Sequence, residues 1–313
     1  MCCLFGLIDY KRTLTGKQKN KFISILSEEC EARGTDAAGV AYNRGGILYV
    51  YKRPLPAHKL KFNIPSESQV VMGHTRMTTQ GNEKYNFNNH PFVGHTENGK
   101  FALAHNGVLH NDALLRKTLN LSKTYIQTDS YIAVQLIEQK RTLNMSSLKY
   151  MAEQVEGSFS FTVLDSMDNV YFVKGDNPLC IYRYSKTGII VYASTEEILK
   201  KAVRRFNFSL GGFKRIEINC GDILKSDCHG NITKSEFDTY GLIQNWYLSN
   251  WRGELFENGY GGLKKAYDDY INDIKSVAGH FGYSSEDVDL LLEEGFSPEE
   301  LEEYFYYEKY RAD

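Results

Sequence analysis

The chain has 313 residues, a formal net charge of −2 at pH 7 and 42% hydrophobic residues, enough for one large domain or a domain with an extension. The small net charge argues against a nucleic-acid partner or an anionic membrane surface, and without an apolar run of about 18 residues we expect no membrane-spanning helix. The beginning of the chain lacks the basic region of a signal peptide, and its six cysteines form no C-x-x-C pair. We therefore expect a cytoplasmic protein with reduced thiols.

The first nine residues place a cysteine directly before an apolar run. The segment 4–8 predicts a buried strand that would hold this end of the chain inside the fold. If Met1 is removed, Cys2 carries a thiol nucleophile and a free α-amino group, whose typical pKa of about 7.7–8.0 suits it to act as the base. The alternative is an ordinary start of translation followed by a strand that buries a small apolar cysteine.

The first half of the chain mixes helical and strand patterns. Polar segments lie at 73–81, 89–92 and 105–108, and two of them directly follow predicted strands. The predicted strands cover 4–8, 40–42, 47–52, 69–73 and 100–104. The predicted helices cover 17–33, a segment capped by Asn111 and ending near 119, a segment capped by Thr128 or Asp129 and ending at 139, and 148–154.

From Ser158 onward the apolar pattern has a period of two, which is typical of antiparallel strands joined by short turns. The predicted strands cover 158–165, 169–174, 179–184, 188–193, 213–218, 222–226 and 232–237, with one helix over 195–205. This order of helices and antiparallel strands predicts a layered α+β fold with stacked sheets, not a parallel βαβ sheet.

A change of composition near Asp238 predicts a boundary between a domain over 2–238 and an extension over 239–313. The extension begins with an aromatic linker and ends in an acidic, tyrosine-rich tail. Its predicted helices cover 263–281, the segment after the cap Ser284 and the segment after the cap Ser297. The tail is compatible with docking a partner, since aromatic residues are enriched at interfaces, and equally with packing as a solvated helical pair.

Several residues in the polar segments have the chemistry of a site, although each also has an ordinary explanation. Arg76 would fit a surface ion pair, Asn106-Gly107 a turn, and Asp129 a helix cap. Their occurrence together with Cys2 is difficult to explain by chance. Five histidines lie in the same region, but none of their spacings is that of a metal-binding helix, so we expect no metal and no other cofactor.

In this combination the chain resembles the class II glutamine amidotransferases, a branch of the N-terminal nucleophile hydrolases. The resemblance is greatest to the glutaminase domains of glucosamine-6-phosphate synthase and amidophosphoribosyltransferase, and it extends from Cys2 to about Phe237. It implies a four-layer αββα sandwich of two antiparallel sheets, here with a C-terminal helical extension. The matching motifs are Cys2, Arg33-Gly34 with Asp36 and Gly39, Gly73-His74-Thr75-Arg76 with Thr79 and Gly81, Asn89-His90-Pro91, His105-Asn106-Gly107, Thr128-Asp129 and Glu156-Gly157.

The resemblance implies that Cys2 attacks the side-chain amide of glutamine, while its α-amino group takes the proton and returns it to the leaving ammonia. The Asn106 side chain and the Gly107 backbone N–H would form the oxyanion hole, where two donors stabilise the charge of the transition state. Water would then resolve a γ-glutamyl thioester to glutamate.

The resemblance also implies how glutamine binds. Arg76 would hold the α-carboxylate in a bidentate fork, and Asp129 would pair with the α-ammonium group. Thr79 and His90 would line or support the site.

Three positions depart from the family pattern. Cys3 stands where relatives commonly have glycine, Met77 replaces an aromatic residue, and Gln80 replaces a histidine. Glutamine hydrolysis is still expected, with changes in rate and side-pocket specificity.

The roughly 75 residues after the predicted boundary are fewer than a sugar isomerase, phosphoribosyltransferase or asparagine synthetase domain needs. The sequence therefore predicts a glutaminase that passes ammonia to a separate synthase partner. Two alternatives stay open: a free-standing hydrolase of glutamine or another γ-glutamyl amide, and a non-catalytic binding module that keeps the fold.

Overall fold

The computed structural model describes residues 2–240 and 242, and in the extension residues 271–272, 274–276, 278–279, 282–293 and 301. The chain divides into two compact units, one over Cys2–Leu242 and one over Ile243–Asp313. The larger unit contains the predicted site residues.

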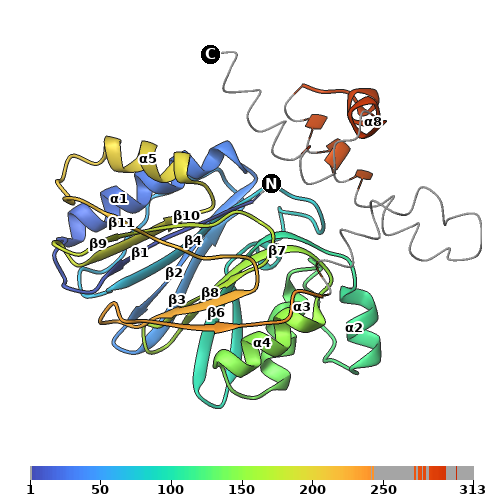
Figure 1. The fold of residues 1–313 in the computed structure, drawn as a ribbon, viewed down its shortest axis with the longest axis horizontal. Helices are drawn as coiled ribbons and strands as arrows, with labels where there is room; N and C mark the ends of the chain where they lie inside the picture. The colour runs from blue at the N-terminus through green and yellow to red at the C-terminus, as the bar shows by residue number, and fades with distance from the viewer. Residues whose placement is uncertain are drawn as a thin grey trace, which may run out of the picture. The chain divides into compact units, whose positions relative to one another are not determined.

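Two antiparallel sheets form the larger unit (Figure 1). Sheet A contains β1 (Cys3–Asp9), β2 (Ala37–Arg44), β3 (Ile47–Arg53), β4 (Val70–Arg76), β9 (Cys180–Tyr184), β10 (Ile189–Ala193) and β11 (Lys214–Ile216), in the order β11-β9-β10-β1-β4-β2-β3. Sheet B contains β5 (Phe92–Thr96), β6 (Gly99–Leu109), β7 (Gly157–Asp165), β8 (Val170–Lys174), β12 (Asp222–Ser226) and β13 (Ile232–Glu236), in the order β13-β12-β8-β7-β6-β5.

Helices cover the outer faces of both sheets. The helices are α1 (Gly16–Glu29) and α5 (Glu196–Arg205) on sheet A, and α2 (Asp112–Thr118), α3 (Tyr131–Gln139) and α4 (Met145–Gln154) on sheet B. One apolar cluster lies between sheet A and its helices, a second between sheet B and its helices, and a third between the two sheets. This arrangement confirms the predicted four-layer αββα sandwich.

Alternation along β1 decides which layer each residue enters. Cys3 and Phe5 pack in the cluster on the helix side, whereas Leu4 and Ile8 pack between the sheets. Successive side chains of a strand point to opposite faces. By the same alternation, Cys2 belongs to the face that looks toward sheet B.

Two strands are longer than predicted, and the additional residues include the predicted site residues Arg76, Asn106 and Gly107. The predicted strands 69–73 and 100–104 were expected to give way to polar loops, but β4 continues to Arg76 and β6 continues to Leu109. Pairing holds both strands this far: β4 pairs with β1 up to Thr75 and with β2 up to Arg76, and β6 pairs with β7 up to Leu109. The ladder hydrogen bonds outweigh the preference of polar side chains for loops.

The prediction of a polar loop over 89–92 was partly wrong, because its last residue, Phe92, begins β5. This edge strand pairs only with β6, and it is too short and too polar to show a clear period-two pattern. The predicted helix 17–33 also ends earlier, since α1 stops at Glu29 and a 3₁₀ turn covers Cys30–Ala32.

The described part of the extension is helical. Helix α8 (Ser285–Glu293) begins after Ser284, whose hydroxyl accepts from the Asp287 N–H at 3.1 Å while the Asp287 carboxylate accepts from the Ser284 N–H at 2.6 Å. This reciprocal cap confirms the predicted cap at Ser284. The predicted cap Ser297 and most of the predicted helix 263–281 lie outside the described residues. None of the helices described here is long and apolar enough to cross a membrane.

Candidate active site

The predicted nucleophile, arginine and asparagine lie on inner faces of the two sheets. The layer between the sheets includes Leu4 of β1, Met72 of β4 and Ala104 of β6. Cys2, Arg76 and Asn106 stand two or four positions along the chain from these residues. Because side chains repeat their direction every second residue in a strand, all three belong to the same inner faces.

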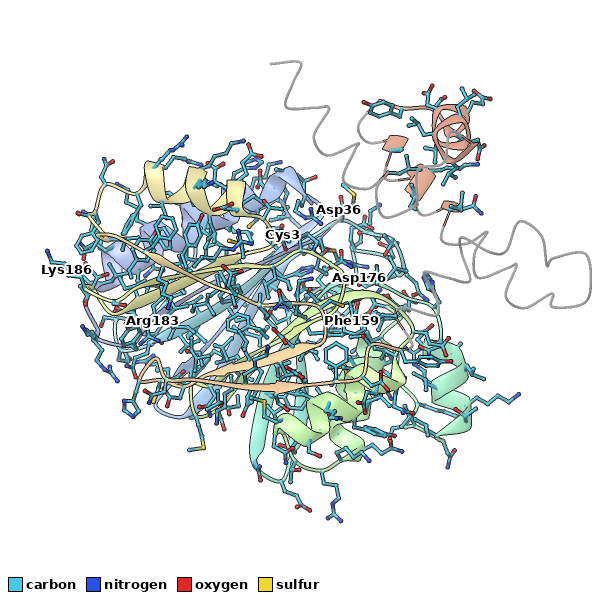
Figure 2. All side chains as sticks on the ribbon, in the orientation of Figure 1. Cys3, Asp36, Phe159, Asp176, Arg183 and Lys186 are labelled. Atoms are coloured by element: carbon cyan, nitrogen blue, oxygen red, sulfur yellow. The ribbon has the colours of Figure 1, made fainter. Side chains whose placement is uncertain are left out.

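The ends of these strands also meet. His74 of β4 donates from Nε2 to the carbonyl oxygen of His105 in β6, at 2.9 Å, and joins sheet A to sheet B beside the site residues. In Figure 2, Cys3 of β1, Asp36 just before β2 and Asp176 after β8 are labelled toward one end of the sandwich, with Arg183 and Lys186 at the other. The candidate site therefore occupies one end of the inter-sheet layer.

Backbone contacts fix the position of Cys2. The buried Arg33 donates from Nε to the Cys2 carbonyl oxygen at 2.9 Å, and the next-but-one residue, Leu4, exchanges hydrogen bonds of 2.9 Å with the Ser194 hydroxyl and backbone. Cys2 as a residue is half-buried, and its thiol donates to the Met77 carbonyl oxygen at 3.5 Å.

The electrostatic surroundings of the Cys2 thiol are mixed. Burial raises its pKa, the positive charge of Arg76 opposes that rise, and the carboxylate of Asp129 adds to it. A thiol of this kind needs a base to become a nucleophile at neutral pH. The thiol also lies close to the end of β4, because its acceptor Met77 follows Arg76 in the chain.

Ser194 is a site residue that sequence reasoning missed. Its hydroxyl accepts from the Leu4 N–H and also from Asn106 Nδ2, at 3.5 Å, so one side chain contacts the start of β1 and the predicted oxyanion donor. The sequence signal was only a serine between a buried strand and a helix cap, a common arrangement.

Asn106 and Gly107 do not form a turn. Both lie inside β6, opposite Ser160 and Phe159 of β7, and Asn106 is 1% exposed. Gly107 has a φ of +135°, and a Cβ there would collide with the Ser158 carbonyl oxygen. Only glycine fits this backbone position.

Arg76 is not a surface ion pair, since it is 3% exposed. Its guanidinium donates from Nη1 to Asn89 Oδ1 at 2.7 Å, and from Nη2 to the carbonyl oxygens of Gln80 at 2.5 Å and Gly81 at 3.2 Å. Guanidinium has five N–H donors in a planar fork. These bonds hold the plane of the fork and leave donors for a ligand.

Asp129 is not the cap of α3, which has Ser130 at its N-cap position and no side-chain capping bond. The carboxylate of Asp129 is 3% exposed. It accepts from the Leu109 N–H at 2.7 Å and from the Ser130 hydroxyl at 3.1 Å. Strand β6 therefore places this negative charge.

The segment before β2 holds the backbone of Arg76 and of the loop that follows it. Asp36 accepts from the Thr78 N–H at 2.7 Å and donates its own N–H to the Arg76 carbonyl oxygen at 3.0 Å. A Cβ on Gly34 would collide with the Arg76–Met77 peptide. These contacts give Asp36 a structural role, holding the loop after β4 against the segment before β2.

His90 and Thr79 have weaker connections to the site. His90 is buried and its ring lies 4.2 Å from that of His74 and 4.3 Å from that of Phe92. Burial lowers the pKa of His90 well below its usual value and that of His74 to about 3, so both rings are neutral at physiological pH. Thr79 is half-buried on the loop after Arg76. Across the described residues, no three His, Cys, Asp or Glu side chains are grouped to hold a metal ion.

Cys3, the departure from the family glycine, does not crowd the nucleophile. It is fully buried on the helix side of β1, where its thiol donates to Cys30 Sγ at 3.0 Å.

We expect native alkylation to distinguish Cys3 from its neighbour. Iodoacetamide should modify the exposed Cys220 and the partly exposed Cys2, whereas Cys3 and Cys30, both 0% exposed, should react only after denaturation, because the reagent must reach the thiolate. Peptide mass mapping before and after guanidinium treatment measures this. Equal modification of Cys2 and Cys3 in the native protein would contradict the burial of Cys3.

Comparisons with known proteins agree with this fold. The family described as "Glutamine amidotransferase domain" matches residues 74–201. The isomerizing glutamine–fructose-6-phosphate aminotransferase of Listeria innocua is 29% identical over 197 residues, covering 61% of this chain and 31% of that protein. The enzyme of the same name from Staphylococcus aureus is 30% identical over 304 residues, covering 88% of this chain and 48% of that protein.

Among solved structures, the glutamine phosphoribosylpyrophosphate amidotransferase of B. subtilis superposes with a TM-score of 0.59 at 20% identity, covering 76% of this chain and 49% of that one. It shares the fold. The chain spans about a third to a half of the length of the curated relatives described here (31% and 48%).

The two stacked antiparallel sheets, their helices and the matched family define a class II glutamine amidotransferase domain with the fold of an N-terminal nucleophile hydrolase. Within that class of enzymes, this domain resembles the glutaminase domains of the isomerizing glutamine–fructose-6-phosphate aminotransferases and of amidophosphoribosyltransferase.

Proposed function

We propose that this protein hydrolyses the side-chain amide of glutamine to glutamate and ammonia. The observation that carries the proposal is a pair of buried opposite charges, Arg76 and Asp129, which are both hydrogen-bonded to Gln80. The Cys2 thiol lies beside them, since it donates to the carbonyl of Met77, the residue after Arg76. Burying charges is costly unless they are paired or serve a ligand. A free amino acid carries the complementary pair of charges.

The proposed reaction begins after removal of Met1. The α-amino group of Cys2 takes the thiol proton, directly or through a water molecule, and the sulfur attacks the amide carbon of glutamine. The Asn106 amide and the Gly107 N–H stabilise the negative charge that develops on the amide oxygen. Collapse of this intermediate breaks the C–N bond, and the α-ammonium group returns its proton to the departing ammonia.

The product of this step is a γ-glutamyl thioester on Cys2. Water, activated by the same α-amino group, adds to the thioester carbonyl, and the C–S bond breaks to give glutamate and the free thiol. Arg76 holds the α-carboxylate of the substrate throughout, and Asp129 holds its α-ammonium group. Thr79 and His90 support this pocket.

We also propose a partner for the ammonia. The curated relatives are longer than this chain and are named as aminotransferases, which supports transfer of ammonia to a synthase rather than its release alone. We place the glutaminase domain over 2–238 and the linker and acidic tail over 239–313, and propose a separate synthase protein as the acceptor.

Ammonia release from glutamine by the purified protein tests the proposal, with intact mass measured to establish removal of Met1. We expect release from the processed protein. A processed protein that releases no ammonia, alone or with a candidate partner, and that binds no glutamine, would refute the proposal in favour of another amide substrate or a non-catalytic module.

Arg76→Lys should raise the KM for glutamine about 10- to 100-fold, with a smaller change in kcat. Lysine keeps the positive charge but loses the fork that Asn89 and Gln80 hold in place, and a hydrogen bond to a charged group contributes about 1.5–3 kcal/mol. Steady-state kinetics measures the change. Arg53→Lys, at an exposed position, is the matched control and should leave the KM within about twofold; an equal KM for Arg76→Lys and wild type would exclude the assigned role.

A further inference from the structure

The two charges proposed to bind glutamine come from different parts of the fold. Arg76 ends β4 in sheet A, whereas Asp129 precedes α3 and accepts a hydrogen bond from β6 in sheet B. The α-carboxylate and α-ammonium group of an amino acid are attached to one carbon atom, so their binding partners must keep one mutual distance. Some contact must fix that distance across the two sheets.

Gln80 makes contacts with both residues. Its carbonyl oxygen accepts from Arg76 Nη2 at 2.5 Å, and its side-chain Oε1 accepts from the Asp129 N–H at 3.0 Å. We propose that Gln80 is a positioning residue that sets the spacing of Arg76 and Asp129 and thereby the preference for substrates with an α-amino group. This inference rests on the proposed function.

The side chain of Gln80 is held by this contact rather than by packing. Gln80 is exposed, so its amide is retained near Asp129 by the hydrogen bond to the backbone N–H. Loss of that bond frees the side chain and with it the carbonyl group that orients the Arg76 guanidinium. The effect is thus transmitted to both charges at once.

A second bridge between the same segments offers a matched control. Gln127 donates its N–H to Asn88 Oδ1 and accepts from Asn88 Nδ2, both at 2.9 Å. This pair joins the loop after β4 to the segment before α3, as Gln80 does, and none of these bonds involves Arg76 or Asp129. Substitution of Gln127 therefore tests the effect of loosening the loop after β4 without removing a contact to Arg76 or Asp129.

The test compares Gln80→Ala, Gln80→Glu and Gln127→Ala with wild type, using glutamine and glutaramate, which lacks the α-amino group. Gln80→Ala should raise the KM for glutamine about 3- to 10-fold, the effect of one net hydrogen bond, with kcat within about twofold. The preference for glutamine over glutaramate, as a ratio of kcat/KM values, should also fall, but by less than this factor, because glutaramate keeps the carboxylate that Arg76 is proposed to bind. Gln80→Glu keeps an acceptor at the same length and should recover most of the preference, and Gln127→Ala should keep it.

An unchanged preference in Gln80→Ala, or an equal loss in Gln127→Ala, would overturn the inference. Calorimetric binding of both compounds to Cys2→Ala, with and without Gln80→Ala, separates this result from failure of the proposed function. If the wild type hydrolyses nothing but Gln80→Ala still weakens the binding of glutamine selectively, the positioning role stands without the hydrolysis. If glutamine does not bind to Cys2→Ala, both the inference and the proposed function are refuted.

Discussion

Replacing Cys2 with alanine should reduce ammonia release from glutamine by at least about 10³-fold, because the variant has no atom that forms the thioester. The fold should stay intact. The contacts that fix this part of the chain run through the Cys2 carbonyl oxygen and the backbone of Leu4, and none of them requires the sulfur. Ammonia release and thermal unfolding, measured side by side, give both results.

The neighbouring cysteine provides the control for this substitution. Cys3→Gly introduces the glycine that the family pattern predicts at this position. Because the Cys3 thiol is directed to Cys30 and away from the site, hydrolysis should persist. Intact mass after rapid acid quenching should show the mass of a γ-glutamyl adduct on wild type and none on Cys2→Ala. Turnover by Cys2→Ala at a rate near wild type would exclude the nucleophile assigned here.

Asn106→Ala should lower kcat about 10²- to 10³-fold, the usual cost of removing one oxyanion donor, and should change KM much less. The amide is needed where charge develops in the transition state, not where glutamine is first bound. Steady-state kinetics separates the two parameters. In the Asn106→Ala variant the Ser194 hydroxyl, which now accepts from the Asn106 amide, still accepts from the Leu4 N–H of β1.

Asn111→Ala is a matched control for this substitution. Asn111 is also a buried asparagine, and its amide bonds the backbone of Gln154 and Glu156 at 2.9 and 3.0 Å, away from the residues of the site. Its loss should lower the free energy of unfolding by about 1–3 kcal/mol with kcat within about twofold. If the two variants lose activity equally, Asn106 acts through stability and not as an oxyanion donor.

Much of the fold could be predicted because alternation is a local property. The apolar run after Cys2 predicted a buried strand, and the two faces of that strand do enter different layers. The period-two segments from Ser158 onward likewise predicted antiparallel sheets. What could not be predicted was how far strands continue. Pairing with β1 up to Thr75 and with β2 up to Arg76 keeps the end of β4 in the sheet, although its polarity suggested a loop.

The site was predictable as a set of residues but not as a set of contacts. Cys2, Arg76, Asn106 and Asp129 could be chosen from motifs, and the structure brings them to one end of the inter-sheet layer. The roles of Ser194 and Gln80 depend on hydrogen bonds between segments 49 to 190 residues apart. No local pattern encodes such contacts, so they become visible only in the folded chain.

The division of the site between two sheets gives the apolar layer a second role. Phe172 of sheet B and Tyr192 of sheet A meet edge to face, with ring centroids 4.8 Å apart, and such side chains determine how thick the sandwich is. The proposed nucleophile Cys2 directly precedes β1 of sheet A, and the proposed oxyanion donors lie in β6 of sheet B. The thickness of the layer therefore also sets the distance between them. Adding or removing a methylene group deep in this apolar layer would therefore change the reaction rate, although the substituted side chain does not touch the substrate.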